Sequence, residues 1–150
     1  MPYGYVIDKE RRLVISTASG QVTSTDIKSH EDRLTSDPDF NPEFNQFVDG
    51  SAATALDISV DEAKTFAQRV YFSPRSRRAF FALSPAIYGM LRLMWAHHEI
   101  AKAQEQIGVF YERNEALKWL GLEALPDPVI PEGAKAPEAA ESPARKAKIA

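Results

Sequence analysis

The residues best placed for phosphate chemistry lie in the segment 47–67, FVDGSAATALDISVDEAKTFA. An apolar run ends before Ser51, a short loop follows, and Ser59 opens a helical pattern. A phosphate on Ser59 would lie at a helix N-terminus, where backbone N–H groups favour anions. The pattern S-V-D-E that begins at Ser59 is also a capping box, in which Ser59 and Glu62 each bond the other's backbone N–H. The sequence thus allows two interpretations of Ser59, a phospho-acceptor or a plain helix cap, and the cap already uses its hydroxyl.

The histidines and serines offer little for metal or catalytic chemistry. His97 and His98 are adjacent in a helical pattern, where neighbouring side chains diverge by about 100°, so the pair cannot hold one metal ion. No two histidines stand four residues apart, as in zinc proteases, and His30 is isolated. The Gly-x-Ser-x-Gly pattern and the spaced glycines of a phosphate-binding loop are absent. We therefore expect no metal site, no cofactor and no catalytic residue, and predict that the protein is not an enzyme.

An arginine-rich segment at 68–78, QRVYFSPRSRR, carries four arginines with Tyr71 and Phe72 between them. Such a cluster can bind a phosphorylated ligand, a carboxylate or single-stranded nucleic acid. Our first interpretation is a solvated connecting loop whose aromatic side chains pack into the core, and an acidic partner protein is the second. The net charge of −3 gives the chain no bulk attraction to nucleic acid, so no nucleic-acid partner is expected.

The composition is that of an ordinary intracellular domain. The 150 residues contain 44% hydrophobic and 26% charged residues and no cysteine. Charge appears at Asp8, too early for a signal peptide, and no apolar run approaches the roughly 20 residues that span a bilayer. We expect a cytoplasmic protein without stable membrane insertion. Residues 126–150 combine five prolines with few apolar side chains, so we predict one domain at 1–125 and a disordered tail at 126–150.

Short β-rich runs alternate with helical patterns in the predicted domain. Strands are predicted at 3–8, 12–18, 45–50, 78–83 and 107–111, the second ending near Gly20. Helices are predicted from a capping box at Thr23 to before Pro38, from Ser59, at about 84–105 after Ser84-Pro85, and from a cap at Asn114 to Gly121. Because strands joined through a helix pair in parallel, the fold class is α/β. We predict an open, mostly parallel five-stranded sheet with one antiparallel strand, covered by four helices.

This order gathers polar residues at the carboxyl ends of the parallel strands. Loops at 19–23, 50–59, 84–85 and 111–114 meet there, each followed by a helix N-terminus that favours an anion. The residues we expect around a small ligand in this crevice are Ser51, Asp57, Ser59, Ser84 and Tyr88.

The longest helix has more apolar bulk than one buried face needs. Its core stripe is predicted to be Ile87, Leu91, Met94, Trp95 and His98. Met90 and Leu93 then fall on a second face, which is typical of a surface for a protein partner or a second copy of the chain.

The order of elements, with FNPEFNQFVDGS, DISVDEAKTFA, SPRSRRAFFAL and GVFYERNEALKWLG, resembles the SpoIIAA-like family of small bacterial proteins over roughly residues 1–122. This largely uncharacterised family is related to STAS domains, the anti-sigma-factor antagonist fold, and often carries the label STAS/SEC14. In the antagonists a partner kinase phosphorylates a serine directly after an aspartate. Here Ile58 follows Asp57, and Ser59 comes one residue later. The SEC14 label implies lipid, although about 120 ordered residues leave little room for a deep lipid cavity.

The sequence favours a non-enzymatic regulatory or protein-interaction module of STAS type that docks through a helix face and the strand-end loops. The alternative is a carrier or sensor of a small anionic or lipophilic ligand in the crevice at the helix N-termini.

Overall fold

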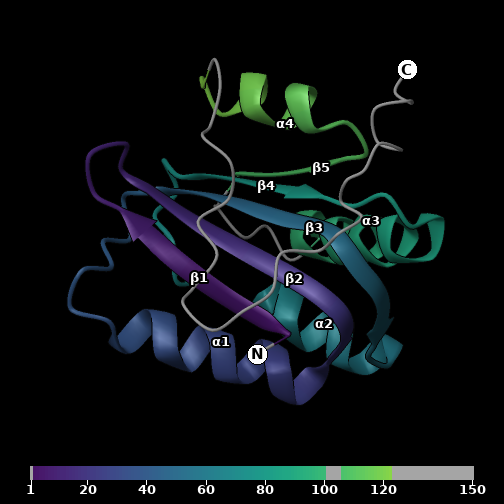
Figure 1. The fold of residues 1–150 in the computed structure, drawn as a ribbon. Coiled ribbons are helices and arrows are strands. Elements are labelled where there is room, and N and C mark those ends of the chain that lie inside the picture. Colours follow the sequence, from purple (N-terminus) through teal and green to yellow (C-terminus); the bar gives the residue numbers. More distant parts are fainter. Residues whose placement is uncertain (1, 101–105, 123–150) are drawn as a thin grey trace.

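The structure, a computed structural model, describes residues 2–100 and 106–122, which form one sheet with helices on both faces (Figure 1). The strands are β1 (Tyr3–Asp8), β2 (Leu13–Thr23), β3 (Asn45–Asp57), β4 (Arg77–Phe81) and β5 (Gln106–Phe110). The helices are α1 (Ser24–Ser36), α2 (Val60–Gln68), α3 (Pro85–Ile100) and α4 (Arg113–Trp119). The tail predicted at 126–150 and the predicted helical turn at 101–105 lie outside the described residues.

The strands follow one another across the sheet in chain order, β1-β2-β3-β4-β5. β1 is antiparallel to β2, and the other three pairs are parallel, which confirms the predicted α/β fold. Right-handed crossovers between successive neighbours place their connecting helices on one face. Figure 1 shows α1, α2 and α3 on that face and α4 alone on the other.

β2 and β3 are longer than predicted. β2 runs past Gly20 to the start of α1, and β3 continues well past Gly50. Gly20 has a φ of +65° and lies beside a shift in the β2–β3 register, so it forms an irregularity inside the strand instead of its end. β4 pairs with β3 only as far as Asp49, and the rest of β3 runs beside β2 alone. The predicted loop at 50–59 is therefore wrong, because most of it is strand.

Three helix starts agree with the sequence and one does not. Capping boxes at Thr23 and Ser59 begin α1 and α2, and the hydroxyl of Ser84 accepts a backbone N–H at the start of α3. α4 begins after Glu112, whose side chain makes no cap bond, so the predicted cap at Asn114 is wrong. The burial of Ala116 and Leu117 against the sheet sets the position of this short helix, not a polar cap.

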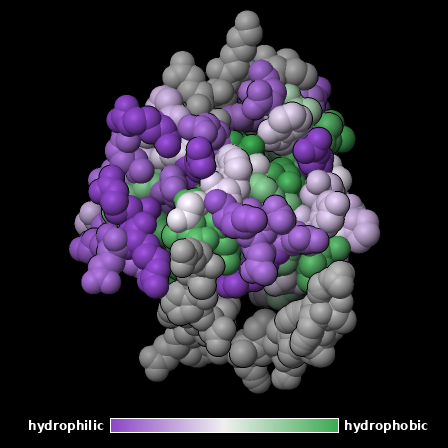
Figure 2. Space-filling view, turned by 90° about the horizontal axis from the view of Figure 1, so that it is seen from above, coloured by the Kyte–Doolittle hydropathy of each residue, from purple (hydrophilic) through white to green (hydrophobic). Residues whose placement is uncertain are grey.

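Each face of the sheet carries an apolar cluster because side chains alternate along the strands. Under α4 the cluster is Leu13, Phe47, Ala79, Phe81, Ala116, Leu117 and Leu120. On the opposite face, near α1, it is Val14, Leu34, Phe44 and Phe72. From the α4 side the surface is mostly hydrophilic, with smaller hydrophobic areas between (Figure 2). Within the described ranges no helix has both the length and the apolar character that crossing a membrane requires.

Candidate functional site

The predicted site residues near α2 lie where β2 and β3 end together. Asp57 pairs with Thr23 across the two strands, and Gln21 Nε2 donates to Asp57 Oδ2 at 3.3 Å. The Ser59 hydroxyl accepts from the Glu62 N–H at 3.0 Å, and the Ser59 N–H donates to Glu62 Oε1 at 2.9 Å. This bond from the Ser59 backbone is the main reason that the pKa of Glu62 is lowered. Ser59 is thus a helix cap, and its phosphorylation stays a prediction.

Ser84 and Tyr88 lie elsewhere, where β4 and β5 end. The Ser84 hydroxyl caps the first turn of α3, and the Tyr88 ring meets Tyr111 edge-on with centroids 5.3 Å apart. Ser51 lies within β3, where its hydroxyl donates to Asp49 Oδ1 at 2.7 Å.

The extension of β3 places the end of β3, with Asp57 and Ser59, farther along the strand direction than the end of β4, with Ser84 and Tyr88. β3 is level with the end of β4 at Asp49 and ends at Asp57. At about 3.3 Å per residue, those eight steps correspond to up to about 26 Å of strand. The structure brings Asp57 and Ser59 together and Ser84 and Tyr88 together, each pair at its own pair of strand ends.

The predicted core stripe of α3 faces the sheet and lines a cavity there. The stripe consists of Ile87, Leu91, Met94, Trp95 and His98, and all five line that cavity. Met90 and Leu93 are half-buried and are not part of the lining. Docking of a partner through these two residues stays a prediction.

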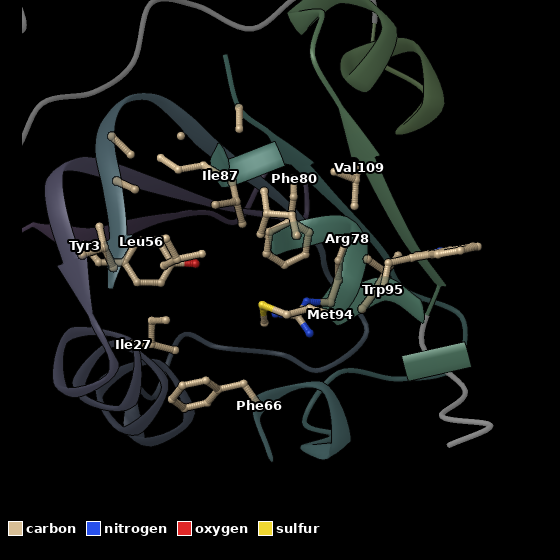
Figure 3. Close-up of a pocket in the computed structure, with 18 of the residues that line it drawn as sticks. Tyr3, Ile27, Leu56, Phe66, Arg78, Phe80, Ile87, Met94, Trp95 and Val109 are labelled. Carbon is tan, nitrogen blue, oxygen red and sulfur yellow. The ribbon is translucent and has the colours of Figure 1, made fainter. Parts of the chain in front are cut away.

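The cavity has a volume of about 100 Å³ and lies between the sheet and the layer of α1, α2 and α3 (Figure 3). Every element except α4 contributes to its wall, including Ile27 from α1, Phe66 from α2, Phe80 from β4 and Val109 from β5. The wall is mostly apolar. The lining includes none of the residues that the sequence predicted to bind a ligand or partner, which are Ser51, Asp57, Ser59, Ser84, Tyr88, Met90 and Leu93. Three residues of the arginine-rich segment, Arg69, Tyr71 and Arg78, do line the cavity.

Small residues explain why this space is hollow. Protein interiors normally fill such a layer to crystal-like density. Here six lining residues are small, namely Ala18, Gly50, Ala53, Ala55, Ala67 and Ala82. Two of them, Ala53 and Ala55, belong to the extension of β3, so the unexpected length of that strand supplies part of the wall.

One part of the wall is polar. In this part of the wall Arg69 and Glu31 form an ion pair, with 2.7 Å between Arg69 Nη1 and Glu31 Oε1. Burial raises the pKa of Glu31, and the bond from Arg69 acts in the opposite direction. Arg78 is buried, donates to Gln46 Oε1 at 2.8 Å and to the Tyr71 hydroxyl at 3.0 Å, and lies over the Tyr71 ring. This part of the wall therefore combines buried charge with aromatic rings.

A chain of buried polar groups continues from Arg78 under the sheet. Gln46 Nε2 donates to Ser16 Oγ at 2.9 Å, and Ser16 Oγ is 2.9 Å from His30 Nε2. His30 stacks on Tyr3 with centroids 3.9 Å apart, and its Nδ1 has no hydrogen-bond partner in the part of the chain that the structure describes. Burial lowers the pKa of His30 to about 3, with smaller contributions from nearby arginines, so the ring is neutral near pH 7.

The other arginines of the 68–78 segment are engaged in local contacts. Arg75 forms two bonds with the Glu43 carboxylate, at 3.0 and 2.9 Å, and Arg77 donates to the Trp119 carbonyl at 2.7 Å. Phe72 is buried in the core. Arg75 and Phe72 fit the predicted solvated loop with aromatic side chains in the core, whereas Arg78 does not, because it is buried within β4. No group of three or more potential metal ligands lies within residues 2–100 and 106–122.

The cavity is the feature that sequence reasoning missed, although the arginine-rich segment that supplies Arg69, Tyr71 and Arg78 to its polar wall was recognised as a cluster. Most apolar lining residues outside 50–59 read as core, because a core and a cavity wall use the same residue types. The available signal was the run of small residues at 52–55, AATA, which we interpreted as part of a loop.

Comparison with known proteins adds a likeness of fold. No family model and no curated protein matches the chain. A solved structure that is similar to it is described as an uncharacterized protein from the DUF3478 family with a SpoIIAA-like fold, from Shewanella loihica PV-4. The two share 18% sequence identity, the match covers 79% of this chain and 91% of the other, and the TM-score is 0.46. A likeness at this level concerns the fold alone.

Proposed function

We propose that the protein is a non-enzymatic binding module that takes a small lipophilic ligand into the cavity between the sheet and α1–α3. The observation that carries this proposal is the cavity itself, with its largely apolar wall of about two dozen residues and its short polar section. Apolar side chains that face an unfilled space forgo dispersion contacts, and a fitting ligand would restore them. The cytoplasmic location predicted from the sequence is part of this proposal.

The cavity also sets the scale of the ligand. A dry apolar cavity of about 150 Å³ is known to bind benzene. A volume of about 100 Å³ therefore suits a compact molecule better than a long lipid chain. This agrees with the expectation that a domain of this size has little room for a deep lipid cavity.

The proposal can be tested by replacing a small lining residue with a larger one that fills the cavity. Ala55→Leu adds a large side chain at a lining position, whereas Thr54→Leu adds the same side chain at the exposed neighbouring position on β3. Native mass spectrometry and isothermal titration with small apolar compounds would compare both variants with the wild type. We expect binding to be lost in Ala55→Leu and kept in Thr54→Leu. Equal binding by all three proteins would refute the proposal.

A second candidate function, association with another protein, is favoured by the exposed apolar residues where β4 and β5 end. Leu83 is 51% exposed and Tyr111 is 63% exposed, and Tyr111 contacts Tyr88 at the start of α3. We propose that a second copy of the chain docks on this edge, extending toward Met90 and Leu93. Light scattering coupled to gel filtration should show a dimer for the wild type and a monomer for Leu83→Glu. A monomeric wild type at high concentration would argue against it.

A further inference from the structure

The hydroxyl of Tyr3 is a polar group inside the mostly apolar cavity. Tyr3 lies on the edge strand β1, and its ring is fixed by stacking on His30 with a centroid distance of 3.9 Å and an angle of 14° between the planes. Figure 3 shows its oxygen directed toward the middle of the cavity. Within the described part of the chain the Tyr3 hydroxyl makes no hydrogen bond, unlike that of Tyr5, which donates to Asp37 at 2.8 Å.

A hydroxyl that faces a mostly apolar cavity favours a ligand group that can form a hydrogen bond with it over an apolar group. Burial is the main cause that raises the pKa of the Tyr3 phenol, so its proton is present at neutral pH and can be donated. The group that fits this hydroxyl on the ligand is therefore a hydrogen-bond acceptor.

Charges in the wall select against an ionised ligand. The carboxylate of Glu31 is part of the lining and would repel an anion. Arg69, the cation nearest to it, is already committed to Glu31 at 2.7 Å. Arg78 is held by Gln46, by the Tyr71 hydroxyl and by the faces of Tyr71 and other aromatic rings. Burying a further charge among apolar side chains would be costly.

We propose that the cavity takes a neutral molecule of about one ring in size, with one hydrogen-bond acceptor that receives the proton of the Tyr3 hydroxyl. This inference rests on the proposed function and specifies its ligand class. The cavity volume limits the size of the ligand, and the Tyr3 hydroxyl determines the polar group that the ligand carries. The Glu31 carboxylate disfavours a ligand with a negative charge.

The test compares two probes of nearly equal shape. Acetophenone carries a carbonyl acceptor, and ethylbenzene has none. Isothermal titration of the full chain with each probe would give a ratio of affinities for the wild type, for Tyr3→Phe and for the matched control Tyr5→Phe. Tyr3→Phe keeps the ring that stacks on His30 and removes only the donor, whereas Tyr5→Phe removes a hydroxyl that bonds Asp37.

Since one neutral hydrogen bond changes affinity by about threefold to tenfold, we expect Tyr3→Phe to lower the acetophenone-to-ethylbenzene ratio by that factor. Affinity for ethylbenzene should be unchanged in Tyr3→Phe, and Tyr5→Phe should keep the wild-type ratio. Circular dichroism would verify that each variant is folded. If Tyr3→Phe does not fold, the same question is answered in the wild type by nuclear Overhauser contacts. The inference requires those contacts between the Tyr3 ring protons and the acetophenone methyl group.

The outcomes separate this inference from the proposed function. Binding of neither probe would overturn both. Binding of both probes with a ratio that Tyr3→Phe leaves unchanged, or wild-type contacts that miss Tyr3, would overturn the inference and leave the cavity function standing. Tighter binding of benzoate than of acetophenone would overturn the neutral ligand class.

Discussion

Replacing His30 with glutamine is expected to remove a loss of stability that the wild-type chain shows on acidification. The His30 ring is buried under the sheet, 1% exposed, with its Nε2 bonded to Ser16. Its pKa is about 3 in the folded chain, against a usual value of 6.5. Desolvation is the largest cause, and the charges of Arg33 and Arg78 act in the same direction.

The direction of the pH effect on stability depends on whether the folded or the unfolded chain binds the proton. Between pH 6.5 and pH 3 the unfolded chain carries a proton on this imidazole that the folded chain does not. The free energy of unfolding therefore falls as the pH falls, by about 1.4 kcal/mol per pH unit once the pH is well below 6.5. From pH 7 to pH 5 the loss from His30 amounts to about 2 kcal/mol, a sizeable part of the roughly 5–15 kcal/mol that a domain has.

Urea unfolding followed by circular dichroism at pH 7, 6 and 5 would measure this loss. Other groups also contribute to the pH dependence; burial raises the pKa of Glu31 in the folded chain, and this works with the opposite sign. The quantity of interest is therefore the difference between the wild type and His30→Gln. Ser29→Ala, on the same helix, keeps His30 and should follow the wild type. Parallel curves for the wild type and His30→Gln, or an NMR titration of His30 with a midpoint above pH 6, would refute the reasoning.

Three further predictions concern stability and are checked by the same unfolding assay. Gly50→Ala should destabilise the fold by about 1–3 kcal/mol, because its Cβ would lie 2.8 Å from the Phe81 carbonyl oxygen. Gly89→Ala should instead stabilise the fold by up to about 1 kcal/mol, because a Cβ at this position in α3 would meet nothing within 4 Å. Ser59→Ala should cost about 1 kcal/mol through loss of the α2 capping box, and an unchanged midpoint would contradict the capping interpretation. Arg69→Met should cost about 2 kcal/mol at pH 7, since it leaves the buried Glu31 carboxylate without its partner. The deficit should shrink as the pH is lowered and Glu31 takes up a proton, and a deficit independent of pH would contradict this.

Local patterns predicted the elements well where one short motif decides the outcome. The capping boxes at Thr23 and Ser59 and the Ser84-Pro85 start each depend on contacts within a few residues, and the structure contains all three. The stripe on α3 was also predicted correctly as the inward face of that helix. Parallel pairing then followed from the alternation of strands and helices, because the connections leave few other arrangements.

Errors arose where a distant neighbour decides the outcome. Gly20 and Gly50 read as strand ends, yet β2 and β3 support each other beyond both residues, and only the pairing between Gln21 and Ala55 or Thr23 and Asp57 shows this. The start of α4 is set by packing of its buried residues on the sheet and not by the side chain of Asn114. Long-range contacts, strand pairing in the first case and packing in the second, override the local signal.

The cavity is the extreme case of the same limit. Ala53, Ala55 and Ala82 are ordinary residues for a packed interior, and so are Phe66 and Met94 opposite them. Whether such residues fill the space between two layers depends on the sum of side-chain volumes from eight separate elements, which no local pattern records. A binding site built from polar residues can be suspected from their types and spacing, whereas a site built from missing volume cannot. That is why the sequence pointed to the serines and the aspartate at the strand ends, whereas the cavity lies between the sheet and α1–α3 and is lined mostly by residues that read as core or as loop.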